Sequence, residues 1–178
     1  MSFDAFMYIP NEEKLKGETQ DEAFGEKGKD KKNAFEILSF EIGAENNINI
    51  GSISSGGGAG KATFKELTVT KKTDTASCEL FTRLCEGGHL QDVHIELRRS
   101  GGAAGASGAT FLKFDFKLVM IQDISWSGSD GDDICEETVV MQYGAMKVAY
   151  SKQDTKGAMK EHSKAMWSRV KNKAALEV

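Results

Sequence analysis

Apolar and polar residues alternate along several stretches of this chain, which is the pattern of β-strands that bury one face. Phe3–Ile9 and Asp92–Arg98 each place apolar residues at every second position, and Leu112–Met120 is the longest such run. Glu136–Tyr150 is predicted as a last long strand. Its apolar parity changes near Gly144, as expected at a β-bulge.

Two more segments are rich in β-formers. Phe35–Ile42 is apolar on both faces, which indicates a strand buried on both sides or one that lies at a subunit contact. Thr63–Lys71 is predicted as a further strand. Between the first two strands, Asn11–Lys32 carries mostly charged residues and is expected to be a solvated loop.

One internal helix is predicted at about residues 75–86, within Asp74–Glu86, and Gly87 is expected to end it in a left-handed conformation. Candidate capping side chains and an apolar stripe support it. The capping candidates are Asp74, Thr75 and Ser77, and the stripe is Leu80, Phe81, Leu84 and Cys85.

The C-terminal segment 156–178 has a different character. It contains six bases and only two acids, and Met159, His162, Met166 and Val170 recur at helical spacing. The composition and spacing therefore predict a basic helical tail after a β-domain that spans 1–155. A solvated face is favoured over an anion-binding one, and the basic field is too weak for nucleic-acid binding.

The 18-residue stretch Gly43–Gly60 is rich in Gly, Ser and Asn, and such long loops in compact domains are usually functional. Its isoleucines alternate with small polar residues, which favours an extended arm or hairpin; a plain surface loop is the alternative. An arm of this kind has little core of its own, so we expect it to bury its isoleucines against a neighbour.

Composition fits one globular domain: 178 residues, 39% hydrophobic, net charge −4, with 19 glycines and one proline. The predicted fold class is mainly β, a small antiparallel barrel or sandwich with a flanking α-helix. No apolar run is long enough for a membrane helix, and no signal peptide is expected. The three cysteines indicate reduced thiols rather than a disulfide framework.

No catalytic, cofactor or metal site is predicted. The stretch Gly56–Lys61 invites a phosphate-binding interpretation, but a P-loop would need glycine at Ser55 and Ser or Thr at Ala62. Cys85 and His89 could be drawn as a nucleophile and its base, yet no orienting group is specified by the sequence. Composition and pattern alone therefore give a soluble β-rich domain without an evident active site, and no enzymatic activity is expected.

Taken in order, several short segments resemble the Hcp family, the hemolysin-coregulated tube proteins of bacterial type VI secretion systems. The similarity extends from Asp4 to about Tyr150. The segments that carry it are Asp4–Ile9, Lys16–Thr19, Glu36–Phe40, Ser55–Lys61, Phe64, Thr70–Asp74, Ala76–Ser77, Leu80–Phe81, Gly88–His89 and Arg98–Gly102.

This resemblance implies a barrel that assembles as a homohexameric ring, with rings stacked into a hollow tube. A contractile sheath, a spike protein and a baseplate would be its partners, with effector proteins carried in the lumen. It also implies synthesis in the bacterial cytoplasm and export through the type VI apparatus. Two alternatives stay open: a tail-tube protein of a phage or other contractile particle, and a ligand-binding or hydrolytic β-barrel.

The arm at 43–60 is the candidate for contact between rings, because it is long, rich in small residues and carries isoleucines that no core explains. The residues expected at this contact or at another subunit contact are Ile48, Ile50, Ile53, Gly56, Gly57, Gly58 and Lys61.

Overall fold

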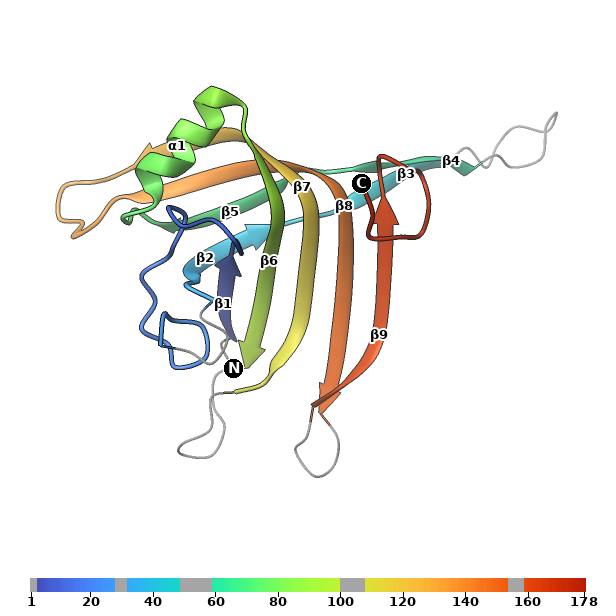
Figure 1. Ribbon diagram of the computed structural model, residues 1–178, viewed down its shortest axis with the longest axis horizontal. Coiled ribbons are helices and arrows are strands. Elements are labelled where there is room, and N and C mark those ends of the chain that lie inside the picture. The colour runs from blue at the N-terminus through green and yellow to red at the C-terminus, as the bar shows by residue number, and fades with distance from the viewer. Residues whose placement is uncertain (1–2, 28–31, 49–58, 100–107, 154–158) are drawn as a thin grey trace.

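The computed structural model describes residues 3–27, 32–48, 59–99, 108–153 and 159–178 (Figure 1). Within these ranges the chain is mainly β-structure with a single helix, as predicted. The strands are β1 (Phe3–Tyr8), β2 (Phe35–Glu41), β3 (Ala44–Ile48), β4 (Ala59–Phe64), β5 (Leu67–Lys72), β6 (His89–Arg99), β7 (Thr110–Ser127), β8 (Glu136–Gln153) and β9 (Met159–Ser168), and the helix is α1 (Ser77–Glu86).

Six antiparallel strands close into a barrel. The sheet runs β5-β2-β1-β6-β7-β8, and β8 pairs again with β5, which returns the ladder to its start. The closing pairs run from Leu67↔Met141 to Lys72↔Glu136. The predicted Thr63–Lys71 strand is in fact two strands, β4 and β5, because the chain leaves the barrel wall before Leu67.

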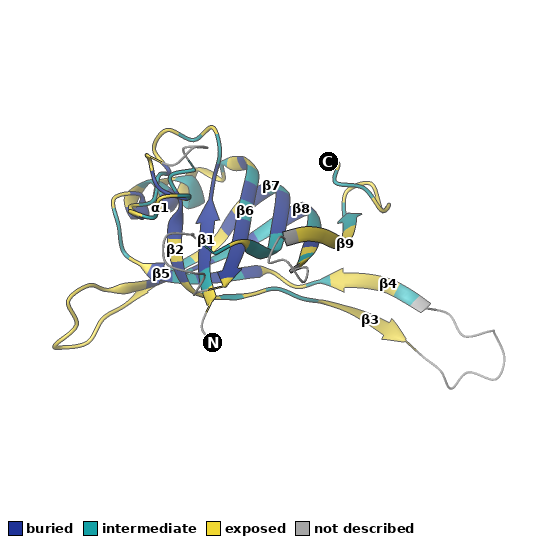
Figure 2. Cartoon of the chain, turned by 90° about the horizontal axis from the view of Figure 1, so that it is seen from below, coloured by how far each residue is buried: buried dark blue, intermediate teal, exposed yellow. Residues whose placement is uncertain are grey.

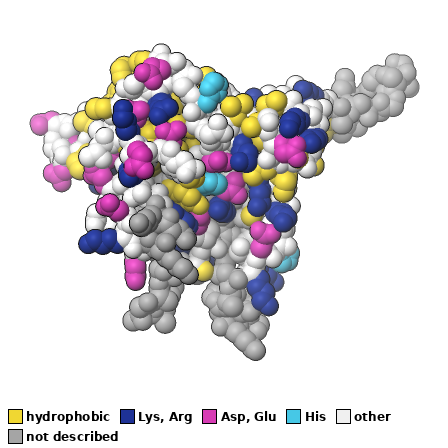
Figure 3. Space-filling model, viewed as in Figure 1, with side chains coloured by type: hydrophobic (Ala, Val, Ile, Leu, Met, Phe, Trp, Pro, Cys, Tyr) yellow, Lys and Arg dark blue, Asp and Glu magenta, His cyan; other side chains and the backbone are white. Residues whose placement is uncertain are grey.

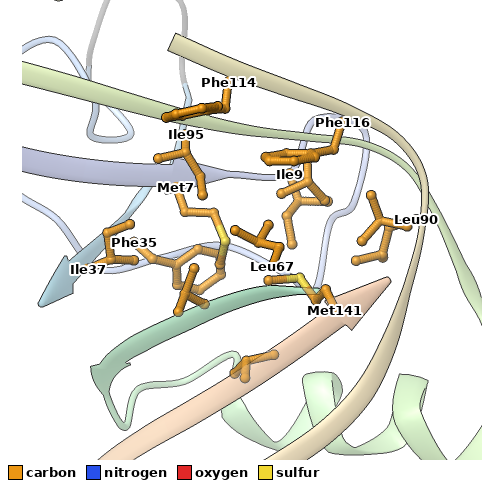
Figure 4. Close-up of a cluster of buried hydrophobic side chains, with 14 of the residues drawn as sticks. Met7, Ile9, Phe35, Ile37, Leu67, Leu90, Ile95, Phe114, Phe116 and Met141 are labelled. Carbon is orange, nitrogen blue, oxygen red and sulfur yellow. The ribbon is translucent and has the colours of Figure 1, made fainter. Parts of the chain in front are cut away.

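The barrel interior is a continuous apolar core (Figure 4). Alternate residues of each strand supply it, so the alternation in the sequence is confirmed as the signal of a one-sided buried strand. The labelled side chains of this core are Met7, Ile9, Phe35, Ile37, Leu67, Leu90, Ile95, Phe114, Phe116 and Met141. Figure 2 shows buried residues concentrated in the barrel strands, whereas β3 and β4 are exposed along most of their length.

In the two longest strands, β7 and β8, the set of residues that faces the core changes at positions that lie side by side in the sheet. In β8 the buried Tyr143 is followed by the buried Gly144, and Met146 is the next residue that packs on the core. In β7, Leu118 adopts a φ of 52°. The buried residues on either side of it, Phe116 and Val119, are three positions apart instead of two. The parity change predicted near Gly144 is therefore confirmed, but the register shift of this pair lies between Ile121 and Asp123.

The segment 11–27 is not the solvated loop that its charges suggested. Leu15 is buried in the main core, and Phe24 stacks on Phe6 with ring centroids 4.1 Å apart. Arg98 contacts both rings of this pair and also donates hydrogen bonds to Asp21. Two apolar side chains are thus enough to hold a highly charged segment against the outside of β1 and β6.

The helix is shorter than predicted and is held differently. Its N-cap is Ala76, and Asp74 accepts a hydrogen bond from the amide of Ala76 instead of capping the first turn. Leu80 is buried, but Phe81 is exposed, so only part of the predicted stripe faces the core. Gly87 ends the helix at φ 66°, as expected.

A buried ion pair joins β5 to β8 next to the helix. Lys71 and Glu137 are each about 1% exposed, and Lys71 Nζ lies 2.6 Å from Glu137 Oε1 and 3.0 Å from Asp74 Oδ1. Trp126 Nε1 donates to the second carboxylate oxygen of Glu137 at 2.8 Å. Burial raises the pKa of Asp74, and the neighbouring Lys71 charge opposes that rise. These groups fix the helix end of the molecule to the barrel wall.

The C-terminal helix prediction is wrong. Residues 159–168 form strand β9, which pairs with β8 from Ala145↔Ser168 to Gln153↔Met159. The C-terminal half of β8 extends past its pairing with β5, so its edge is free to accept another strand. That distant edge, rather than the local spacing of apolar residues, decides the conformation of the tail.

Candidate assembly surfaces

The predicted arm is an antiparallel hairpin that extends away from the barrel. β3 and β4 pair from Ala44↔Phe64 to Ile48↔Ala59, in a two-stranded sheet separate from the barrel (Figures 1 and 2). All five residues of β3 are exposed, and Ile48 is 62% exposed. An isolated two-stranded ribbon is marginal in water, so this hairpin needs a neighbouring surface.

One glycine in the hairpin is required by a close approach of the two strands. A Cβ atom added at Gly60 would lie 2.6 Å from the carbonyl oxygen of Asn47, a distance that side chains do not tolerate. The ladder of β3 and β4 also shifts register between Asn46 and Ile48. Gly60 therefore serves the pairing of the ribbon itself.

The base of the hairpin is held firmly on the barrel. Lys65 N–H donates to the Gly43 carbonyl at 2.9 Å and closes the ribbon, while Tyr143 Oη donates to the Lys65 carbonyl at 2.9 Å. Arg169 lies over the rings of Phe64 and Tyr143, at 5.8 and 5.2 Å from their centroids. Burial raises the pKa of Tyr143 to about 12, so its hydroxyl stays protonated and able to donate.

Arg169 completes this clamp with hydrogen bonds of its own. Its Nη1 donates to the Tyr143 carbonyl at 2.9 Å and to the Gln142 side chain at 3.0 Å. We call Phe64, Tyr143 and Arg169 the hairpin clamp. Sequence reasoning missed it, because its members come from three segments that no local pattern connects.

Two of the residues predicted for subunit contact lie in the hairpin strands. Ile48 ends β3 and Lys61 lies in β4, and both are exposed. Ile50, Ile53, Gly56, Gly57 and Gly58 lie outside the described residues.

Charged side chains on the outside of the barrel form a compact ion-pair network. Glu96 accepts hydrogen bonds from Tyr8 at 2.7 Å, from Lys32 at 3.0 Å and from Thr110 at 2.8 Å. Burial alone would raise the pKa of Glu96, but these three donors and the Lys32 charge hold it below its usual value. The hydrogen bond from Arg98 likewise lowers the pKa of Asp21, against an opposing effect of burial.

The candidate nucleophile and base are not brought together as a site. Cys85 lies in the last turn of α1 and His89 is the first residue of β6, and both side chains are exposed. The described contacts include no hydrogen bond between them. Within the described ranges, no three His, Cys, Asp or Glu side chains lie close enough together to hold a metal ion. In the same part of the chain, no helix has the length and apolar character that crossing a bilayer requires.

Comparison with known proteins decides the family. The family model described as "Type VI secretion system effector, Hcp" matches residues 6–150. This chain belongs to the Hcp family. The protein Hcp1 of Pseudomonas aeruginosa is 27% identical over 98 residues, which cover 55% of this chain and 59% of that protein. The aligned region thus spans about three fifths of the curated relative's length.

Solved structures show the same fold. A type six secretion system protein superimposes with a TM-score of 0.84 at 26% identity, covering 98% of this chain and all of the other. Hcp1 from Salmonella typhimurium gives a TM-score of 0.71 at 24% identity, again over 98% of this chain. The Hcp-like barrel with one flanking helix is therefore confirmed, and the phage tail-tube alternative is not favoured.

Proposed function

We propose that this Hcp family member is the repeating subunit of the inner tube of a type VI secretion system. Six copies would close into a ring, rings would stack into a hollow tube, and a contractile sheath would drive the tube outward. The observation that carries this proposal is the exposed hairpin fixed at its base on a barrel that superimposes on a type VI protein over nearly its whole length.

The hairpin supplies the contact between rings. It presents Ile48 and Lys61 beyond the barrel, and the clamp fixes its direction. The exposed Ile48 side chain is costly in a subunit that stays alone, because apolar area in water is unfavourable by about 25 cal/mol per Å². Burial of the ribbon on the next ring removes that cost.

The remaining partners follow from this role. A sheath, a spike protein and a baseplate would contact the assembled tube, and effector proteins would be carried in its lumen. The chain would be made in the cytoplasm and exported by the apparatus itself. We infer a structural rather than a catalytic role, since the described part of the chain gives the exposed Cys85 and His89 no orienting contact of the kind that nucleophilic catalysis requires.

The first experiment measures the mass of the purified chain in solution and images the particles. Six copies of the 19.4 kDa chain give about 116 kDa, and we expect open rings at that mass. A chain that stays monomeric at every concentration would contradict ring formation. A saturable small-molecule site on such a monomer would instead support the ligand-binding alternative.

The second experiment tests the hairpin. Ile48→Asp with Ile50→Asp should leave single rings intact and abolish the stacking of rings, seen by negative-stain imaging. Ile134→Asp is the matched control, because Ile134 is similarly exposed at 51% but lies in the turn between β7 and β8. Normal tubes from the double variant would rule out the hairpin as the stacking contact.

A further inference from the structure

Opposite charges gather on the two sides of this barrel. The segment 11–27 and the turn between β7 and β8 lie on one side, and β9 lies on the other (Figures 1 and 2). Segment 11–27 has six acids and three bases, and residues 129–136 have four acids and no base, whereas residues 159–178 have five bases and two acids. Figure 3 shows acidic side chains at the end formed by the β7–β8 turn and mainly Lys and Arg over β9.

Strand β9 is an exposed strand at the edge of the sheet. Residues 160–165 are exposed, and among the described strands β9 pairs only with β8. Within the described residues its outer edge is bridged at Ser168 alone, which pairs with Lys173. Such an edge offers free backbone groups to a neighbouring chain. Lysines are common on edges of this kind, and here they give the edge its positive charge.

A pair of like charges across β8 and β9 indicates an anionic partner. Lys152 of β8 and Lys160 of β9 are direct cross-strand neighbours, and both are exposed. Like charges in directly opposite positions destabilise a sheet unless a counter-charge lies between them. Neither lysine forms an ion pair with another described residue. Lys164 is also exposed and lies 3.5 Å from Glu161 in an ion pair. We call Lys152, Lys160 and Lys164 the basic edge.

The opposite side carries exposed acids, namely Glu22, Glu26, Asp130 and Asp133. Glu22, Asp130 and Asp133 form no hydrogen bond or ion pair with another described residue, and Glu26 has only an electrostatic interaction with Lys16 among the described contacts. We call these four residues the acidic side.

An exposed aromatic pair lies close to the acidic turn. Phe81 and Trp126 are each 47% exposed, with ring centroids 5.8 Å apart. Exposed aromatics bordered by charge are typical of protein interfaces, where aromatic residues are enriched. The acidic side therefore combines unpaired charge with an apolar contact surface.

We propose that the basic edge of one copy docks against the acidic side of a second copy of this chain. This inference rests on the proposed ring and names the surfaces that close it. Every copy carries both surfaces on opposite sides, so the contact is heterologous and repeats from copy to copy. Complementary charge selects the partner and its orientation, and it suppresses pairing of two like sides.

Charge reversal tests this contact. The acid-reversed variant is Glu22→Lys, Glu26→Lys, Asp130→Lys and Asp133→Lys; the base-reversed variant is Lys152→Glu, Lys160→Glu and Lys164→Glu. All seven side chains are exposed, so both variants should fold, which circular dichroism and thermal melting verify. Each variant alone should be monomeric by light scattering, a roughly sixfold drop in mass.

An equimolar mixture of the two variants gives the decisive measurement. In the mixture every acidic surface again has a basic partner, so rings of alternating variants should form near the wild-type mass. The control is Glu41→Lys, Glu45→Lys, Glu66→Lys and Glu86→Lys, four exposed acids away from the acidic side that bring the net charge from −4 to +4, as the acid-reversed variant does. The control should form rings.

The outcomes separate this contact from the ring itself. Rings from either reversed variant alone, or no recovery on mixing, would overturn the proposed contact while wild-type rings stand. Loss of rings in the control would also overturn it, since net charge alone would then explain the effect. A monomeric wild-type chain would overturn ring formation and the contact with it.

Discussion

The barrel and the β3–β4 hairpin are built from the same kind of antiparallel strand, yet they differ in what surrounds them. Ile37 in β2 is 6% exposed inside the barrel, whereas Ile48 in β3 is 62% exposed. The barrel satisfies its apolar faces within one chain, and the hairpin does not. The difference separates the strands that stabilise the folded chain from the strands that we propose to serve assembly.

The largest expected contrast between the two regions comes from equivalent lysine substitutions. Lys71→Met leaves the buried Glu137 without its cation, and removing one partner of a buried pair costs about 3–5 kcal/mol of unfolding free energy. Lys61→Met in the exposed hairpin should change it by less than about 0.5 kcal/mol. Urea unfolding of both variants measures this. Equal effects would mean that the hairpin contributes to monomer stability as the barrel does.

Acid should lower the unfolding free energy of the barrel by protonating carboxylates of the ion-pair network on its outside, before it affects the hairpin. The pKa values of Glu96 and Asp21 are lowered in the folded chain, so the unfolded chain binds protons first as pH falls. The stability from both groups is present above their ordinary pKa values of 4.5 and 3.8 and is lost as pH drops through the lower folded values. Urea midpoints between pH 6 and roughly pH 3 follow this loss.

A variant separates this effect from general acid unfolding. Glu96→Gln removes one of the two titrating groups, so its urea midpoint should fall less steeply with pH than that of the wild-type chain. Parallel curves for the two proteins would show that Glu96 does not couple to folding.

A smaller effect is expected at the junction of the two regions. Tyr143→Phe removes the hydrogen bond to the Lys65 carbonyl, which is worth about 0.5–1.5 kcal/mol. Hydrogen exchange of the Lys65 amide should become faster, while amides of β6 keep their protection. Tyr150→Phe is the control, since Tyr150 is an exposed tyrosine of the same strand β8. Unchanged exchange at Lys65 would show that Tyr143 does not hold the hairpin.

The smallest expected effect lies in the hairpin alone. Ile48→Asp replaces a side chain that water already surrounds, so the unfolding free energy of the monomer should change by less than about 0.5 kcal/mol. Thermal melting of dilute, unstacked protein measures it. A loss above about 1 kcal/mol would show that the hairpin packs on its own barrel.

The barrel could be predicted from sequence because its signal is local. Alternation at every second residue marks a strand with one buried face, and Phe114 and Phe116 follow that rule. Leu118 breaks it by adopting a positive φ, which no propensity of leucine indicates. The Gly144 position was recognisable because glycine tolerates the close contacts that the face change requires there.

The features that sequence reasoning missed depend on contacts between distant segments. Met159, His162, Met166 and Val170 fit a helix locally, but the free edge of β8 makes this segment a strand. The richness of 43–60 in Gly, Ser and Asn, interrupted by isoleucines, was enough to predict an arm and to propose a subunit contact there. It gave no sign of the clamp residues that hold the base of the hairpin, because these lie in other segments.

The hairpin clamp has a consequence for how the chain is made. Arg169 lies 104 residues after Lys65, and a ribosome adds about 5–20 residues per second, so the clamp arrives roughly 5–20 s after the arm it holds. During that interval the arm has no fixed direction. Under the proposed role, a nascent chain in this interval is therefore poorly suited to join a growing tube, and it becomes competent to do so only after translation has passed Arg169.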